Sequence, residues 1–279
     1  MPDAMPPSLD ALRRQIDEID DEIHALIRAR AAVVTQVAAA KAASADGAPA
    51  PAFRPGREAA VLRALVARHD GPFALASLVR IWREIMSGMT RIQQDVAVAV
   101  HRPDKGDRVG WDIARDHFGL GMRYLPMRRA GDVVAAVRDG QAGVGVLAAP
   151  GEEDGEEPWW PMLAADSSEV PRIVLKLPFL RPSEGAAPRA HVAVTLPGPE
   201  PEAADACYLA IEAAPDASRD RVANVLKAAG VPVRSVLSAP GAAGLYLAEA
   251  DGGQPAAIAD AAIRQIHAIG GYPAPIAPG

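Results

Sequence analysis

Cysteine is almost absent from this sequence, since its 279 residues include only Cys207. An intrachain disulfide is therefore impossible, and a metal site built on cysteine is not expected. The first ten residues, MPDAMPPSLD, contain neither the basic region nor the apolar run of a secretory signal. No uninterrupted apolar run is long enough to span a bilayer. These absences predict a soluble, cytoplasmic protein with no metal and no membrane partner.

Clustered positive charge is missing as well. The net charge of −6 lies entirely after residue 97, because acidic and basic residues balance before it. A nucleic-acid-binding surface needs gathered Lys and Arg side chains, so nucleic acid is not expected as a partner. Hydrophobic residues make up 49% of the chain, which is enough for a globular core. The length suggests two or three domains.

The stretch 9–41 predicts one long helix around which the rest is organised. Such a helix would be roughly 50 Å long. This exceeds what a domain of this size usually covers alone, so we expect a partner chain. Its apolar residues recur at alternating steps of three and four, which places them in one stripe: Leu9, Leu12, Ile16, Ile19, Ile23, Leu26, Val33 and Val37.

Arg30 interrupts this stripe where the spacing predicts an apolar residue, and Lys41 lies at its edge. A guanidinium on a buried face is costly unless an anion meets it. The stripe itself has no acidic residue. Two interpretations remain open: Arg30 binds an anionic ligand, or it pairs with a carboxylate of another helix.

Two further helices are predicted over 57–69 and 75–96, after a loop rich in Pro, Ala and Gly over 44–56. Residues 1–97 should therefore be three helices with no strand, forming the first domain. In the third helix the apolar residues again alternate by three and four: Leu75, Leu78, Trp82, Ile85, Met89, Ile92 and Val96.

Beyond residue 97 the sequence pattern predicts strands that alternate with helices. Residues 98–200 predict an α/β region, expected to have a parallel sheet, with an acidic linker at 151–158. Residues 201–279 predict a small ferredoxin-like α+β domain, whose last helix covers 256–272. The predicted fold class is thus multidomain: an all-α domain followed by α/β and α+β parts.

Polar side chains from the three helices can form one site. Several fixed cations with one carboxylate and one amide suit a small substrate with two carboxylates and a hydroxyl, because an arginine fork binds a carboxylate bidentately. The set comprises Arg13, Arg30, Lys41, Arg57, Glu58 and Gln93.

In order and spacing, residues 9–97 resemble the all-helical class of chorismate mutases. The resemblance lies in LRRQIDEIDDEIHALIRAR, the lysine that follows it, RPGRE and IWREIMSGMTRIQQ. It implies an isomerase that rearranges chorismate to prephenate in phenylalanine and tyrosine biosynthesis. Such a pericyclic reaction needs no cofactor and no general base, because catalysis consists of positioning and electrostatic stabilisation.

The resemblance also implies a role for each residue. Arg30 and Arg13 would bind the two carboxylates, with Arg13 reaching in from the partner subunit of an interlocked homodimer. Lys41 and Gln93 would hydrogen-bond the ether oxygen, where negative charge grows. Arg57 would support the anionic end of the substrate.

Glu58 would hold the ring hydroxyl. From the residues alone, Arg57 and Glu58 could instead be an exposed first turn, where the helix dipole favours an acidic residue. Two departures from the family pattern bear on substrate affinity. Arg54 stands where enteric members carry an acidic residue, and Met89 stands where a small hydroxyl residue is common.

The C-terminal two thirds resemble a degenerate prephenate dehydratase followed by an ACT-like domain. The stretch DVVAAVRDGQAGVGVLAAP resembles the dehydratase segment ahead of its Asn-Ser pair, but here APGEEDG follows, and no Thr-Arg-Phe triplet is present. Dehydratase activity is therefore not expected. The terminal IGGYP resembles the end of an ACT domain, for which a structural or dimerising role is favoured over binding of an aromatic amino acid effector.

Two alternatives to a mutase with a non-catalytic extension remain. One is a complete bifunctional chorismate mutase–prephenate dehydratase, against which the missing motifs argue. The other is a non-enzymatic regulatory or dimerisation protein that binds an aromatic amino acid. Under that hypothesis Arg30 would pair internally and chorismate would not be consumed.

Overall fold

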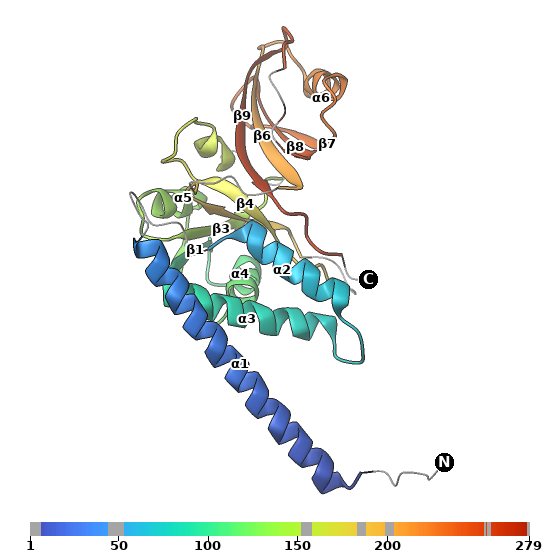
Figure 1. The fold of residues 1–279 in the computed structure, drawn as a ribbon. Coiled ribbons are helices and arrows are strands. Elements are labelled where there is room, and N and C mark those ends of the chain that lie inside the picture. The colour runs from blue at the N-terminus through green and yellow to red at the C-terminus, as the bar shows by residue number, and fades with distance from the viewer. Residues whose placement is uncertain are drawn as a thin grey trace, which may run out of the picture.

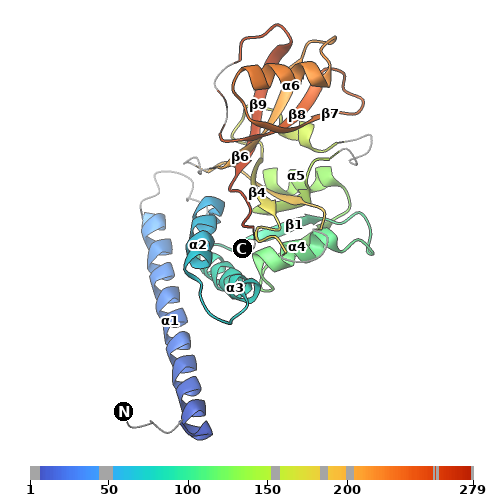
Figure 2. The ribbon, with the colours of Figure 1, turned by 90° about the vertical axis from the view of Figure 1, so that its right-hand side faces the viewer.

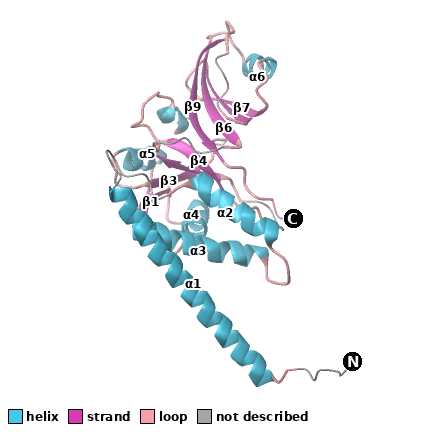
Figure 3. Cartoon of the chain, viewed as in Figure 1, coloured by secondary structure: helices cyan, strands magenta, loops and turns pink. Residues whose placement is uncertain are grey.

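The computed structural model describes residues 7–43, 53–151, 158–182, 188–198, 204–253, 255 and 258–277. Its N-terminal part is three helices, α1 (Leu9–Ala43), α2 (Pro55–Arg68) and α3 (Leu75–Gln93), which precede every described strand (Figure 3). This confirms the predicted helical region. Helix α2 begins at Pro55, two residues before the predicted start. Proline suits this first position because its missing N–H has no helical partner there.

Helix α1 projects from the molecule, and only its C-terminal part lies beside α3 (Figures 1 and 2). It is described throughout and has no buried residue. Its apolar stripe is open to solvent in this single chain, and Leu26 in the middle of it is 70% exposed. By length and mean hydropathy, α1 is also the one described helix that could cross a membrane. Arg28 and Arg30 interrupt that stretch, and the stripe occupies one side only.

A nine-stranded mixed sheet forms the remainder, in the order β2-β1-β3-β5-β4-β9-β6-β8-β7. Strands β1, β2 and β3 are parallel, as predicted for the α/β region, and β5 joins them antiparallel. The elements after α3 are β1 (Ala97–His101), α4 (Val109–Phe118), β2 (Arg123–Met127), α5 (Ala130–Arg138), β3 (Val144–Ala148), the 3-10 helix η1 (Trp160–Leu163), β4 (Arg172–Leu177), β5 (His191–Thr195), β6 (Ala206–Ala213), α6 (Arg219–Ala228), β7 (Val233–Ser238), β8 (Leu245–Asp251) and β9 (Ile263–Tyr272).

The predicted last helix over 256–272 is wrong, because Ile263–Tyr272 is strand β9 in the interior of the sheet. The isoleucines at 263, 266 and 269 are three apart, a spacing that suggested a helix. Pairing with β6 and β4 decides otherwise. At the β4 contact Gly270 has φ +150°, and a Cβ there would lie 2.1 Å from the carbonyl oxygen of Ile173. Only glycine allows the two strands to approach so closely.

The order β9-β6-β8-β7, with α6 after β6, is that of a ferredoxin-like unit. The prediction of a ferredoxin-like unit is thus confirmed in its strands and its first helix. Its second helix is missing from the described part of the β8–β9 connection, which is residues 252–253, 255 and 258–262. The sheet of this unit is continuous with that of the α/β region through β9 and β4.

Helices α2, α3 and α4 pack on one face of the α/β sheet, and α5 packs on the other. Strand β1 divides its side chains between two cores: Val98 and Val100 pack with Leu62 of α2 and Met86 of α3, whereas Ala97 points to the α5 side. Two of the three N-terminal helices therefore share a core with the sheet, and α1 alone stands outside it.

Candidate functional site

Lys41 and Gln93 meet where the C-terminal end of α1 lies beside the end of α3. Lys41 Nζ donates a hydrogen bond to Gln93 Oε1 at 3.4 Å, and Gln93 Nε2 donates to the carbonyl oxygen of Met89 at 3.4 Å. Both side chains are half-buried. The structure therefore brings together the cation and the amide that the sequence predicted for a single site.

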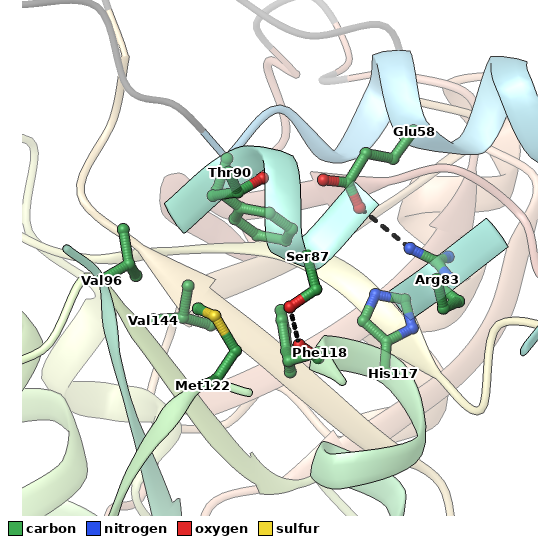
Figure 4. Close-up of a pocket in the computed structure, with 10 residues that line it drawn as sticks. Glu58, Arg83, Ser87, Thr90, Val96, His117, Phe118, Met122 and Val144 are labelled. Carbon is green, nitrogen blue, oxygen red and sulfur yellow. Dashed lines mark hydrogen bonds and ion pairs between the residues drawn. The ribbon is translucent and has the colours of Figure 1, made fainter. Parts of the chain in front are cut away.

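Glu58, in the first turn of α2, points inward between α2 and α3 rather than into solvent (Figure 4). Its Oε2 accepts a hydrogen bond from Arg83 Nη1 at 2.9 Å, and the two side chains are 16% and 4% exposed. An exposed first turn, the alternative left open for this residue, does not describe Glu58. It does describe the neighbouring Arg57, which is exposed.

Sequence reasoning missed Arg83. The predicted row on α3 ran through Leu78, Trp82 and Ile85, which are only half-buried. The most deeply buried row of α3 is the neighbouring one, which holds Val79, Arg83, Met86 and Thr90. These residues are also spaced by four and three, so the signal was an arginine within a second apolar row. The row is buried because α3 contacts the sheet and α4 as well as α1 and α2.

Arg83 is enclosed by groups from the α/β region. Its guanidinium carbon lies 5.3 Å from the centre of the Phe179 ring, which follows β4. His117 of α4 is also close, and its pKa is held well below its usual value by burial and then by the charge of Arg83. Burial lowers the pKa of Arg83 itself to about 10, against the opposing attraction of Glu58. Arg83 is therefore charged and His117 neutral at pH 7.

A small cavity of about 20 Å³ lies beside this pair, which is room for one water molecule. Among the described residues, Arg83 Nη2 and His117 Nε2 are buried without a hydrogen-bond partner. Ser87 on the same wall donates to the carbonyl oxygen of Phe118 (Figure 4). The lining residues are Phe53, Glu58, Arg83, Ser87, Thr90, Val96, His117, Phe118, Met122 and Val144.

The remaining predicted residues are not gathered in this chain. Arg30 is exposed on α1, and Arg13 is exposed and pairs with Asp10 at 3.3 Å. Arg30 lies seventeen positions after Arg13 on the same helix, which is a distance of about 25 Å. One chain therefore cannot bring these two arginines onto one small ligand. Of the two departures from the family pattern, Met89 is buried in α3 and Arg54 precedes α2.

The C-terminal part contains a second, partly buried polar cluster, centred on Glu249 of β8. Lys176 Nζ donates to Glu249 Oε1 at 2.7 Å, Tyr208 donates to Oε2 at 3.1 Å, and Tyr272 also donates to Oε1. Burial opposes the charge of Glu249, but these donors keep its pKa below the usual value. The cluster joins β4 to the ferredoxin-like unit. Among the described residues, no group of three His, Cys, Asp or Glu could hold a metal.

The helical region thus holds a cation and an amide in contact and a carboxylate between its helices, and a mixed sheet follows it. Residues 12–94 match the family model described as chorismate mutase type II. The N-terminal third of the chain is therefore a chorismate mutase type II domain.

Curated relatives match about half of this chain. A bifunctional chorismate mutase/prephenate dehydratase from Pseudomonas aeruginosa is 32% identical over 148 residues, which is 53% of this chain and 40% of that protein. A protein of the same description from Stutzerimonas stutzeri is 34% identical over the same shares of the two chains. The match thus spans about two fifths of the length of these relatives.

Solved structures show only a distant likeness. GqqA, described as a novel type of quorum quenching acylase, is 17% identical with a TM-score of 0.46, over 65% of this chain and 96% of that one. Prephenate dehydratase from Streptococcus mutans is 12% identical with a TM-score of 0.43, over 63% and 97%. Neither likeness assigns an activity to this chain.

Proposed function

We propose that this protein is a chorismate mutase whose C-terminal two thirds are non-catalytic. The observation that carries the proposal is the meeting of Lys41 and Gln93 inside a chorismate mutase type II domain. Their N–H groups are donors of the kind needed where an ether oxygen gains negative charge as its bond to carbon breaks. A preorganised donor of this kind contributes on the order of 3 kcal/mol to transition-state stabilisation.

The rearrangement moves electrons within one substrate, so the protein acts by positioning and charge. In the proposed mechanism Arg30 and Arg13 of the partner subunit bind the two substrate carboxylates, and Arg57 supports the anionic end. All three side chains are exposed in the single chain. Glu58 accepts the hydrogen bond of the ring hydroxyl. On substrate binding, the ether oxygen takes the place of Gln93 Oε1 as the acceptor for Lys41 Nζ.

A second copy of the chain completes the proposed site. The exposed apolar stripe of α1 is the surface on which it would pack, because an open row of leucines and isoleucines in water is unfavourable. An antiparallel α1 from the partner would bring Arg13 of one chain toward Arg30 of the other. Such a homodimer resolves the separation of about 25 Å between these residues within one helix.

A second candidate function is the bifunctional mutase–dehydratase named for the relatives. The absent Asn-Ser and Thr-Arg-Phe motifs oppose it. Conversion of prephenate to phenylpyruvate by the purified chain would favour this candidate over the mutase-only proposal. A regulatory role of the ACT-like end, with an aromatic amino acid as effector, remains a prediction.

The decisive test is the loss of chorismate absorbance, measured for the wild type and for Arg30→Ala. We expect turnover by the wild type and a fall of about a hundredfold or more in the variant. Arg28→Ala is the matched control, since Arg28 is also an exposed arginine of α1 and has no proposed role. No turnover by a folded, dimeric wild type would overturn the proposal.

A further inference from the structure

Glu58 carries a proposed role in the mutase site, and it contacts Arg83, to which the family resemblance gave no role. We propose that Arg83 is a positioning residue for Glu58: it holds the carboxylate ionised and turned inward, and it is itself held by the α/β region. This inference rests on the proposed mutase function. Under this proposal, residues beyond position 97 help to orient a side chain of the mutase site.

The first argument is the geometry of the pair. Arg83 and Glu58 come from different helices and are joined by a hydrogen bond of 2.9 Å between oppositely charged groups. Arg83 is 96% buried, so little water screens the interaction. A charge-assisted hydrogen bond of this kind fixes both the orientation and the ionised state of the carboxylate.

The second argument is what surrounds Arg83 on its other sides. Phe179 presents its ring face to the guanidinium from the segment after β4, and His117 of α4 stands beside it. Both belong to the α/β region, whereas Glu58 belongs to the mutase domain. The guanidinium therefore lies at the boundary of the two regions, and a shift of α4 or of Phe179 would move the partner of Glu58.

The third argument is the charge balance around the pair. The cavity wall contains three ionisable side chains, which are Glu58, Arg83 and the neutral His117. A wider cleft on the other side of Arg83 adds Arg80 and Asp116, which pair with each other at 2.5 Å. From α1, Lys41 is directed to Gln93. Arg83 is thus a cation in direct contact with the Glu58 carboxylate.

The test compares mutase activity against pH for Arg83→Gln and for the wild type. A carboxylate that loses a cation at this distance takes up a proton more readily. We expect the acid limb of the kcat/KM profile to move up by about one pH unit in Arg83→Gln. At pH 7 we expect kcat/KM to fall at least tenfold. Arg83→Lys retains a charge and should restore the position of the acid limb in part.

Arg80→Gln is the matched control, because Arg80 lies one turn earlier on α3 and its ion pair is exposed. Its profile should coincide with that of the wild type. If Arg83→Gln fails to fold, the pH profiles of Arg83→Lys and Phe179→Leu are measured in its place. Each variant should lower kcat/KM and shift the acid limb of the profile. If neither acid limb shifts, the role of Arg83 is overturned.

The failure of this inference differs from the failure of the mutase proposal. An active wild type whose Arg83→Gln variant is folded and has an unshifted acid limb shows that Arg83 is only structural. A folded wild type without turnover overturns the mutase assignment, and the positioning role falls with it.

Discussion

Helix α1 and the pair α2–α3 belong to one chorismate mutase type II domain, but they are packed in opposite ways. No residue of α1 is buried, whereas Leu62, Leu65 and Met86 of α2 and α3 lie in a core shared with β1 and β3. Helices α2 and α3 therefore bury their apolar faces within the chain, whereas the apolar face of α1 is exposed to solvent. An amphipathic helix can thus pack its apolar face on a sheet of its own chain, or it can leave that face open for a helix of another chain.

The largest effect on stability is expected from disrupting the buried Glu58–Arg83 pair, which joins α2 to α3. Glu58→Gln leaves the Arg83 charge without its partner in the interior, and we expect a loss of about 3–5 kcal/mol in the free energy of unfolding. The double variant Glu58→Gln/Arg83→Met removes both charges and should regain most of this loss. Urea unfolding measures both. A single variant as stable as the wild type would show that the pair does not hold the helices.

One leucine in each region tests whether its apolar face packs within the chain or against a second chain. Leu62 is fully buried, so Leu62→Ala should lower the free energy of unfolding by about 2–5 kcal/mol. Leu26→Asp on α1 should instead abolish the proposed dimer and leave the unfolding of the sheet unchanged. Sedimentation and urea unfolding separate the two effects. A dimer that survives Leu26→Asp would place the partner surface elsewhere.

The pH dependence of stability tests the boundary between the two regions at His117. Burial and Arg83 lower the pKa of His117 well below its usual value. The unfolded chain gains a proton near pH 6.5 and the folded chain does not. Stability should therefore fall as the pH decreases below that value, by about 1.4 kcal/mol per pH unit.

In His117→Gln this contribution is absent, so urea midpoints between pH 7 and pH 5 should fall less steeply than in the wild type. His101 and His191 also have pKa values lowered by burial, and they contribute equally to both proteins. If the midpoints of the two proteins fall equally steeply with decreasing pH, His117 takes up a proton in the folded protein as readily as in the unfolded chain.

The smallest effect is expected at the surface of α3. Arg80 pairs with Asp116 at 2.5 Å, but both side chains are more than 60% exposed. Exposed ion pairs contribute little because water and salt screen them, so Arg80→Gln should change the free energy of unfolding by less than about 1 kcal/mol. A larger loss by urea unfolding would mean that α3 is held to α4 at its surface as well as in its core.

Local patterns in the sequence determined the three helices and the alternation of strands and helices after them. Spacing by three and four fixes which residues share a helix face, and runs of β-branched residues bounded by turns fix strands, so these features need no distant contact. The roles of Arg13, Arg30 and Arg57 are still predictions, because a single chain leaves them exposed.

The tertiary structure alone decided which face of α3 is buried, that Glu58 faces Arg83, and that Ile263–Tyr272 is a strand. Each depends on segments far apart in the chain. Isoleucines three apart favour one face of a helix, but isoleucine also suits a strand because it is β-branched. Pairing with β6 and β4 selects the strand, because every backbone group inside a sheet must find a partner. Likewise an arginine in an apolar row is tolerated only where another element supplies a carboxylate, and α2 does so here.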